Sequence, residues 1–312
     1  MSDTRVDRDL LLNGMKITII GNGQIGQAII YLLNKSEKKH TIEVYDKDNS
    51  KNESHKTLKE CLNGTNFIFL CVPSWCLKET LKKISENKID SQTILISLSK
   101  GINASSKESA DEMIEKNIKK AKYALLSGPM VAKEILKNEM SFAILASKDK
   151  KVFEKVSKLF EGTKLKLEYS KNVRSVAFSG ILKNIYTFAI SIISNSPADD
   201  NLKGFLSAKA IKEMKQIMAI LGLDKKIIVG TSGLGDFIAT LSSKYSQNKK
   251  VGIDISTKGG TFLKSEGLIS LPPLISIIGK KYKKLPMLYL LEKVILEKKD
   301  SKTEVNNFLK EI

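Results

Sequence analysis

The chain has 312 residues, of which 42% are hydrophobic and 28% charged, so it has the composition of a globular protein and the length of two domains. Its net charge of +18 comes from 49 lysines and three arginines spread through every segment, which excludes an arginine-rich nucleic-acid footprint and leaves a general attraction for anions. Three cysteines exclude a disulfide framework in a chain of this length.

Seven short apolar runs, separated by segments with helical spacing, fill residues 15–172. Strands that alternate with helices are typical of a doubly wound sheet, so we predict an α/β domain with a mostly parallel sheet over residues 15–172. Clear helical spacing occurs at Ile25–Leu33 and Val152–Phe160. The predicted strands are Met15–Ile20, Thr41–Tyr45, Asn66–Val72, Thr93–Leu98, Tyr123–Ser127, Ser141–Ala146 and Lys164–Tyr169.

A glycine-rich segment, Gly21-Asn22-Gly23-Gln24-Ile25-Gly26, follows the first strand and opens the first helix. In this context Gly21 permits a tight turn, Gly23 lets the backbone approach a pyrophosphate, and Gly26 lets helix and strand pack closely. The helix N-terminus offers free N–H groups to the phosphates. Asp46 ends the second strand, where an acid binds the ribose 2′-hydroxyl and repels a 2′-phosphate. The segment predicts a Rossmann-like domain that binds NAD(H) in preference to NADP(H).

Residues 173–312 have helical spacing and are predicted to form an all-helical domain, with its longest patterns at Val173–Ser194 and Asn201–Leu221 and its last at Thr303–Ile312. The first pattern is long enough to cross a membrane, but Lys183 and Asn184 near its centre would be costly in hydrocarbon. We therefore expect a buried core helix and no membrane span. The polar first fourteen residues lack the apolar region of a signal peptide, so we expect a cytoplasmic protein.

Lys183 is the best candidate for acid–base catalysis. Reduction of a carbonyl needs a proton donor beside the oxygen, yet His40 and His55 lie beside the second strand and are expected on the surface. No metal-ligand spacing appears, so no metal is expected. Burial in an apolar helix would lower the pKa of Lys183, and Asp236, in another apolar segment, is the expected carboxylate partner. The pattern leaves open a lysine that extends out of the helix to solvent.

Eight short motifs stand in order between residues 15 and 300: the glycine-rich segment, Cys71-Val72-Pro73-Ser74, Ser99-Lys100-Gly101, Leu126-Ser127-Gly128-Pro129 leading to Ala132-Lys133-Glu134, Leu182-Lys183-Asn184, Gly233–Asp236, Ser246-x-Asn248 and Glu266-Gly267. Together they resemble the soluble NAD(P)-dependent glycerol-3-phosphate dehydrogenases. The resemblance implies a Rossmann-like domain followed by a helical domain, with the active site between them. It implies interconversion of dihydroxyacetone phosphate and sn-glycerol 3-phosphate, which supplies the glycerol backbone of phospholipids.

The resemblance also implies roles for single residues. Lys183 would donate and accept the proton, Asp236 would be its electrostatic partner, and Thr240 a neighbouring hydrogen-bonding group, although Thr240 could instead bond only along its own helix. The expected catalytic residues are Lys183, Asp236, Lys100 and Thr240. The expected substrate contacts are Lys100, Gly128, Lys183, Asn184, Asp236, Ser246, Gln247 and Asn248, of which Ser246 and Asn248 could equally be helix caps. Beyond the glycine-rich segment and Asp46, the expected cofactor contacts are Lys100, Ala132, Gln247 and Glu266.

Three departures from the family pattern concern the substrate pocket. Gln247 replaces the family's phosphate-clamping arginine, a loss worth on the order of 1.5–3 kcal/mol unless Lys244, Lys249 or Lys250 supplies the charge. Met130 replaces a small polar residue. The stretch from Asn248 to Glu266 is about ten residues shorter than in typical members, so a surface helix is expected to be lost or remodelled.

These observations favour an NAD(H)-dependent glycerol-3-phosphate dehydrogenase with a small phosphorylated substrate. One alternative is a paralogous dehydrogenase of another small hydroxy compound, which Gln247 and Met130 motivate. The other is a non-catalytic dinucleotide-binding sensor, against which the intact Lys183, Lys100 and Asp236 argue. The sequence leaves the oligomeric state open, a homodimer included.

Overall fold

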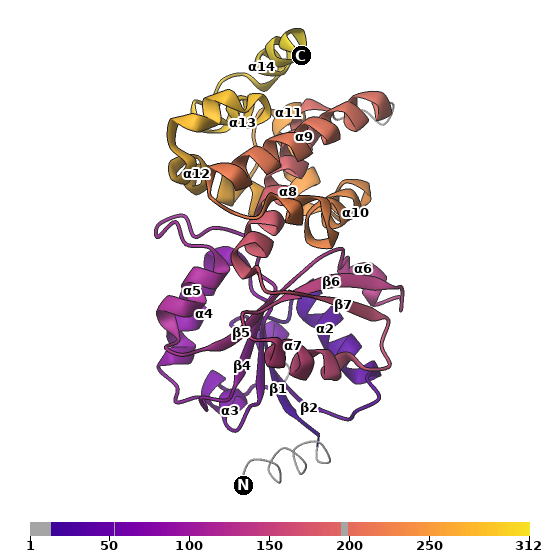
Figure 1. Cartoon of the computed structure of the whole chain (residues 1–312), viewed down its shortest axis with the longest axis vertical. Helices are drawn as coiled ribbons and strands as arrows, with labels where there is room; N and C mark the ends of the chain where they lie inside the picture. The colour runs from indigo at the N-terminus through magenta and orange to yellow at the C-terminus, as the bar shows by residue number, and fades with distance from the viewer. Residues whose placement is uncertain (1–13, 53, 195–198) are drawn as a thin grey trace. The chain divides into compact units, whose positions relative to one another are not determined.

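The structure is a computed structural model that describes residues 14–52, 54–194 and 199–312 (Figure 1). Its contacts divide the chain into two compact units. The first holds the residues up to Ser99 together with Ala110–Val173, and the second holds Lys100–Ser109 with Arg174–Ile312. The division differs from a single expected boundary near residue 172, because the segment Lys100–Ser109 groups with the later helices.

The first unit is built on one seven-stranded sheet in the order β2-β1-β3-β4-β5-β6-β7. Neighbouring strands are parallel except β5 and β6, which are antiparallel. The chain leaves β1 for β2 on one side and returns to β3 on the other, so the carboxyl end of β1 is a topological switch point, where dinucleotides bind in such sheets. The strands are β1 Lys16–Ile20, β2 Thr41–Tyr45, β3 Phe67–Leu70, β4 Ile94–Ser97, β5 Lys122–Ser127, β6 Ser141–Ala146 and β7 Leu165–Ser170.

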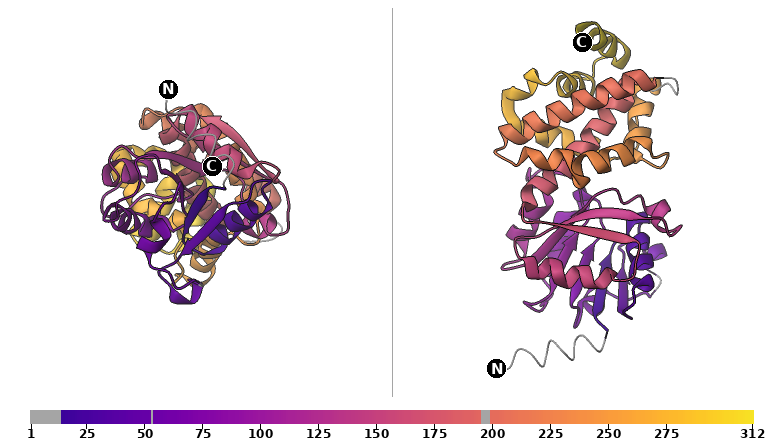
Figure 2. Two further views of the ribbon diagram at one scale, coloured as in Figure 1. Left: turned by 90° about the horizontal axis from the view of Figure 1, so that it is seen from below. Right: turned by 45° about the vertical axis from the view of Figure 1, so that its right-hand side comes forward.

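Helices cover both faces of this sheet, which is why β3 and β4 are apolar at almost every position and fully buried. Helix α4 packs on α5 and α2 packs on α6, and Figure 1 shows the two pairs on opposite sides of the sheet. Figure 2 shows β6 and β7 side by side, with α7 against them. The helices are α2 Gln24–Lys35, α3 Leu58–Leu62, α4 Ser74–Ser85, α5 Ala110–Asn117, α6 Ala132–Ile135 and α7 Lys150–Ser157, with short 3₁₀ turns η1 Asn49–Lys51 and η2 Lys158–Phe160.

The regular elements among the described residues of the second unit are all helical, whereas Lys100–Ser109 is a loop closed by an isolated β-bridge between Ile102 and Ser109. The elements of this unit are α8 Val173–Ile193, α9 Asp200–Ile220, η3 Lys225–Val229, η4 Thr231–Gly235, α10 Asp236–Ser242, α11 Gln247–Lys258, α12 Glu266–Ile278, η5 Gly279–Lys284, α13 Pro286–Leu291, η6 Glu292–Leu296 and α14 Ser301–Glu311. The turn η4 is a π-helix, a widened turn that often stands at functional sites, and it ends directly before Asp236.

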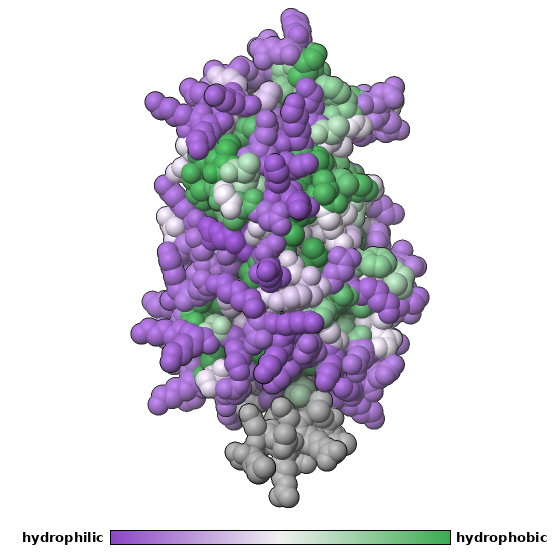
Figure 3. Space-filling view, viewed as in Figure 1, coloured by the Kyte–Doolittle hydropathy of each residue, from purple (hydrophilic) through white to green (hydrophobic). Residues whose placement is uncertain are grey.

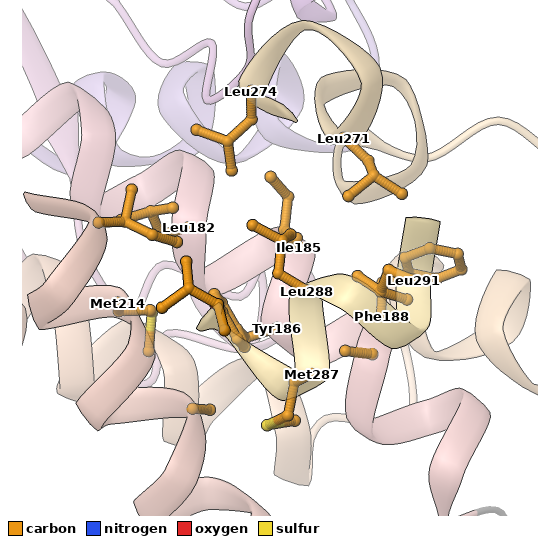
Figure 4. Close-up of a cluster of buried hydrophobic side chains, with 14 of the residues drawn as sticks. Leu182, Ile185, Tyr186, Phe188, Met214, Leu271, Leu274, Met287, Leu288 and Leu291 are labelled. Carbon is orange, nitrogen blue, oxygen red and sulfur yellow. The ribbon is translucent and has the colours of Figure 1, made fainter. Parts of the chain in front are cut away.

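Helix α8 forms the centre of this unit. Figure 4 shows Leu182, Ile185 and Phe188 of α8 among Leu271 of α12 and Leu288 of α13, all of them buried. By length and mean hydropathy α8 could cross a membrane, but the whole of its apolar window lies inside the structure. It is therefore the buried core helix that the sequence predicted, apolar around its full circumference because neighbours surround it.

Candidate active site

The glycine-rich segment forms the turn between β1 and α2 in the first unit. Gly21 has a φ of +101°, and a Cβ there would lie 2.9 Å from the carbonyl of Cys71. A Cβ on Gly26 would lie 2.0 Å from the carbonyl oxygen of Gly21, so only glycine lets α2 start this close to the turn. Gly23 has no atom within 4 Å of its Cβ position, which leaves an open approach to its backbone.

Helix α2 begins at Gln24 with Gly23 as its N-cap and no side-chain cap. Its first N–H groups are therefore available to an outside acceptor, and the positive end of the helix dipole adds to their attraction for an anion. An open glycine backbone beside an uncapped helix N-terminus fits the pyrophosphate of a dinucleotide.

Asp46 follows β2 and binds the turn through both carboxylate oxygens. One accepts the backbone N–H of Asn22 at 2.7 Å, and the other accepts that of Asp48 at 2.9 Å. The side chain of Asn22 donates in turn to the carbonyl of Lys51 at 2.8 Å. The acid at the end of the second strand thus lies against the glycine-rich turn.

Three further residues of interest lie in the connection after β5. A Cβ on Gly128 would come within 2.6 Å of the backbone of β6 at Phe142 and Ala143, so close strand packing requires glycine there. Met130 packs its side chain against the core of the first unit, and Ala132 opens α6 beside it. Met130 thus occupies an apolar contact where the family pattern has a polar group.

In the second unit, two lysines share one carboxylate. The Lys183 ammonium donates to Asp236 Oδ1 at 3.1 Å, and the Lys100 ammonium donates to Oδ2 at 2.7 Å. Lys183 also donates to the Thr240 hydroxyl at 2.7 Å, which itself donates to the Asp236 backbone carbonyl at 2.6 Å. Lys183 and Asp236 are only 6% and 4% exposed, so these charges are compensated inside the protein instead of by water.

The electrostatics of this cluster set the acidity of both groups. Burial lowers the pKa of Lys183 to about 8, with Asp236 opposing the shift and Lys100 adding to it. Burial alone would raise the pKa of Asp236, but the two ammonium groups outweigh it and lower that pKa. A buried lysine with a pKa near neutrality can hold or release a proton at physiological pH, which a surface lysine cannot.

Two buried asparagines connect this cluster to the neighbouring helices. Asn184 donates to the backbone carbonyl of Lys100 at 3.2 Å and accepts from the Asn248 side chain at 2.9 Å. Asn248 Oδ1 accepts the backbone N–H of Gly267 at 2.9 Å. A Cβ on Gly267 would lie 2.5 Å from the carbonyl oxygen of Asn184, so the close approach of α12 to α8 requires glycine at this position. This chain of hydrogen bonds, from Gly267 through Asn248 and Asn184 to Lys100, is called the asparagine relay below, and it fixes the backbone of Lys100.

The start of α11 carries the other substrate contacts expected from the sequence. Ser246 is the N-cap and its hydroxyl accepts the N–H of Lys249, while Gln247 is exposed at the first helical position. Lys249 is half-buried and donates to the carbonyl of Leu241 at 2.6 Å. Lys244 lies over the exposed ring of Tyr245, with 5.4 Å between ammonium and ring centre. Of the lysines near Gln247, Lys249 is thus the one held in place by the fold.

The structure therefore joins Lys100, Lys183, Asp236, Thr240, Asn184 and Asn248 in the second unit, and the glycine-rich segment with Asp46 in the first. Glu266 opens α12 near enough to Lys183 to raise its pKa slightly. The sequence did not reveal the Lys100–Asp236 ion pair or the link from Asn248 to Gly267. Of the two histidines expected on the surface, His55 is exposed, whereas His40 is only partly exposed: both of its ring nitrogens are buried, and burial lowers its pKa.

Comparisons with known proteins agree along both units. Two sequence models describe the N-terminus and the C-terminus of NAD-dependent glycerol-3-phosphate dehydrogenase, and they match residues 43–153 and 172–306. A Clostridium botulinum glycerol-3-phosphate dehydrogenase [NAD(P)+] is 26% identical, over 94% of this chain and 97% of its own. A glycerol-3-phosphate dehydrogenase [NAD(P)+] from Fusobacterium nucleatum is also 26% identical, over 95% of this chain and 96% of its own.

The fold has a close counterpart among solved structures. A glycerol-3-phosphate dehydrogenase from Coxiella burnetii superposes with a TM-score of 0.82 at 20% identity, covering 95% of this chain and 99% of that one. The predicted fold class, a Rossmann-like domain followed by a helical one, is confirmed. The two matched segments together span well over half of the chain, and the chain belongs to the NAD-dependent glycerol-3-phosphate dehydrogenase family.

Proposed function

We propose that this protein is an NAD(H)-dependent sn-glycerol-3-phosphate dehydrogenase of the cytoplasm, which interconverts dihydroxyacetone phosphate and sn-glycerol 3-phosphate. The observation that carries the proposal is the buried Lys183, hydrogen-bonded to Asp236 and Thr240 in a family whose members perform this reaction. A nicotinamide dinucleotide, when bound, supplies or accepts the hydride. The residues that would hold it are the glycine-rich segment and Asp46, with Lys100, Ala132, Gln247 and Glu266 as further contacts.

Lys183 acts as the acid and base of this mechanism. When the substrate carbonyl is reduced, charge develops on its oxygen, and the Lys183 ammonium donates a proton to that oxygen and becomes a neutral amine. In the reverse direction the neutral amine removes the hydroxyl proton. Asp236 and Thr240 hold the ammonium in place, and Lys100, on the other oxygen of Asp236, contributes a second positive charge toward the substrate.

The phosphate end of the substrate is assigned to the polar groups around the start of α11. Asn184 and Asn248 each use one N–H in the relay, and an amide nitrogen has a second to offer a phosphate oxygen. Ser246, Gln247 and the backbone of Gly128 complete the proposed contacts. Lys249 is the residue best held by the fold to replace the charge of the missing arginine.

The test follows NADH absorbance after dihydroxyacetone phosphate is added to the purified protein. We expect rapid oxidation of NADH by the wild type and a loss of kcat of at least about a hundredfold in Lys183→Ala, the scale of general acid catalysis. The exposed Lys212→Ala, on α9, is the matched control and should be unchanged. A loss below tenfold in Lys183→Ala would contradict the assigned proton donor, and no turnover of this substrate by the wild type would contradict the function.

A second candidate is a dehydrogenase of another small hydroxy compound. The exposed, uncharged Gln247 and the core-facing Met130 favour it, because both remove polar contacts that the family uses for its substrate. A panel of phosphorylated and unphosphorylated hydroxy compounds, assayed with NAD, separates the two. Preference for sn-glycerol 3-phosphate by tenfold or more would reject the second candidate.

A further inference from the structure

A cavity of about 240 Å³ lies in the second unit at the ends of three helices. Ile192 and Ile193, at the end of α8, and Ser256, near the end of α11, form one side of it. The first turns of α14 form the other, and Figure 1 shows α14 beyond α11 in this unit. The volume is below the roughly 300–1,000 Å³ of pockets that take drug-sized ligands, so it suits a small metabolite.

The lining defines the chemistry of a ligand. Ile192 and Ile193 are buried and, with the half-buried Val305, form the aliphatic part of the lining, beside the hydroxyl-bearing Ser256 and Ser301. Lys302 is the one charged side chain among the described lining residues, and the amide of Asn306 can donate beside it. Both lie in the first two turns of α14, whose dipole also favours negative charge.

Two acids at the start of α14 stand beside the lining residues in sequence, and both have partners: Glu304 pairs with Lys293 at 3.1 Å. Asp300, the N-cap of α14, accepts both the N–H and the hydroxyl of Thr303 at 2.8 Å. One positive charge, an amide donor and an aliphatic wall therefore suit an anion with a short hydrocarbon part.

We propose that this cavity is a regulatory site for a small aliphatic anion, a short carboxylate or a phosphate monoester, bound by Lys302 and Asn306. Binding is independent of the function proposed above, whereas regulation rests on it. Helix α8 carries Lys183 nine residues before Ile192, about 14 Å along the helix, and α11 carries Asn248 eight residues before Ser256, about 12 Å. A ligand at these helix ends therefore touches the two helices that carry the lysine and the asparagine relay.

The contact between the two helices is too tight to absorb a displacement. A Cβ on Gly252 of α11 would lie 2.6 Å from Ser191 Cβ and 2.9 Å from the carbonyl oxygen of Phe188, both on α8. Gly252 lies between Asn248 and Ser256 in sequence. A shift of one helix at the cavity is thus passed to the other before it reaches Lys183.

Calorimetric titration of the full chain tests the site with four probes: hexanoate, butyl phosphate, inorganic phosphate and 1-hexanol. We expect one or both aliphatic anions to bind at least tenfold more tightly than inorganic phosphate or the neutral alcohol. The tighter binder of hexanoate and butyl phosphate shows whether the site prefers a carboxylate or a phosphate monoester. Binding of neither anion overturns the proposal.

Variants separate this cavity from the substrate site. Lys302→Met should weaken binding at least fivefold, while Lys310→Met, exposed later on α14, should not change it. Val305→Phe should fill the cavity and abolish binding; a thermal melt like that of the wild type shows that it folds. Equal affinity of Lys302→Met and wild type overturns the site. In the NADH assay, a saturating anion should change kcat or KM at least twofold in the wild type and not in Val305→Phe, and equal rates overturn the regulatory part.

Discussion

Asp236 pairs with two ammonium groups, accepting from Lys183 on one carboxylate oxygen and from Lys100 on the other. That arrangement keeps Lys183 close to the point of losing its proton, since burial and Lys100 both favour the neutral amine. Asp236 therefore serves both to position Lys183 and to hold its pKa in a useful range.

The pH dependence should reveal Lys183 directly. With a pKa of about 8, kcat/KM for carbonyl reduction should fall as the pH rises through 8, because the ammonium is the proton donor. For alcohol oxidation it should rise over the same range, because the neutral amine is the base. Asp236→Asn removes a group that raises the pKa of Lys183, so the pH at which each of the two kcat/KM profiles changes should move lower. Profiles with the same slope in both directions would contradict the assignment.

Asp46 should govern the choice of cofactor. Asp46→Asn removes the negative charge but keeps an oxygen for the N–H of Asn22. We expect kcat/KM with NADPH to rise at least tenfold relative to NADH, because the repulsion of the 2′-phosphate is lost. Asp48→Asn, an exposed acid two residues later, is the control for a general charge effect. An equal change in both variants would argue against Asp46 as the discriminating acid.

Single residues differed in how far their roles could be predicted. Lys183 and Asp236 stood out because each is a charge in an apolar segment, and a buried charge needs a partner. The pairing of Lys100 with Asp236 joins residues 136 positions apart, and one among many lysines carries no local signal of it. The Asn184–Asn248 contact was equally hidden, because an asparagine at a helix start predicts a cap as well as a relay.

At the level of helices, Gly267 should fix the approach of α12 to α8. Gly267→Ala places a Cβ against Asn184 and Asn248, so we expect a lower thermal midpoint and a loss of kcat/KM of at least tenfold. Gly204→Ala in the exposed interior of α9 is the matched change, with nothing within 4 Å of the new Cβ. It should stabilise the protein by roughly 0.5–1 kcal/mol through helix propensity. Similar effects of the two substitutions would rule out the close contact as the cause.

Helix α13 depends on Glu213 in α9. Its buried carboxylate accepts the N–H groups of Met287 at 2.9 Å and Leu288 at 3.3 Å, and the hydroxyl of Tyr186 at 2.8 Å. Glu213→Leu leaves these donors unpaired, so we expect the free energy of unfolding to fall by about 2–4 kcal/mol, seen as a lower midpoint in calorimetry. The neighbouring Lys212→Leu, at an exposed position, is the control. A midpoint within 1 °C of wild type, roughly half a kcal/mol at most, would show that Glu213 does not cap α13.

The direction of β6 was the element-scale feature that the sequence pattern did not specify. Buried strands read as continuous apolar runs whichever way they run, so periodicity gives no direction. The connection from β5 to β6 holds only the short α6, whereas a parallel crossover needs a longer covering helix. The four-residue α6 is too short to cover a face of the sheet, and this shortness agrees with the antiparallel direction of β6.

Across the whole molecule, the positive charge should act on substrate capture. Figure 3 shows hydrophilic side chains spread over the visible face, in keeping with the scattered lysines. For an anionic substrate we expect KM to rise several-fold between about 50 and 500 mM sodium chloride, with kcat unchanged, because salt screens long-range attraction. Sucrose at equal osmolality is the control. A constant KM across this range would exclude steering by the net charge.

The grouping of Lys100–Ser109 with the later helices has a consequence for the order in which the protein forms. During synthesis these ten residues emerge before any of the helices they pack with, while the strands on either side of them can already pair. More than a hundred further residues must be synthesised before Lys100 can pair with Asp236. The same delay applies to Ile102, which is fully buried in the helical core of the finished protein. Until then Lys100 lacks the carboxylate with which it pairs in the folded protein, and release of the N-terminal portion alone would leave Ile102 without its helical partners, exposed to chaperones and proteases.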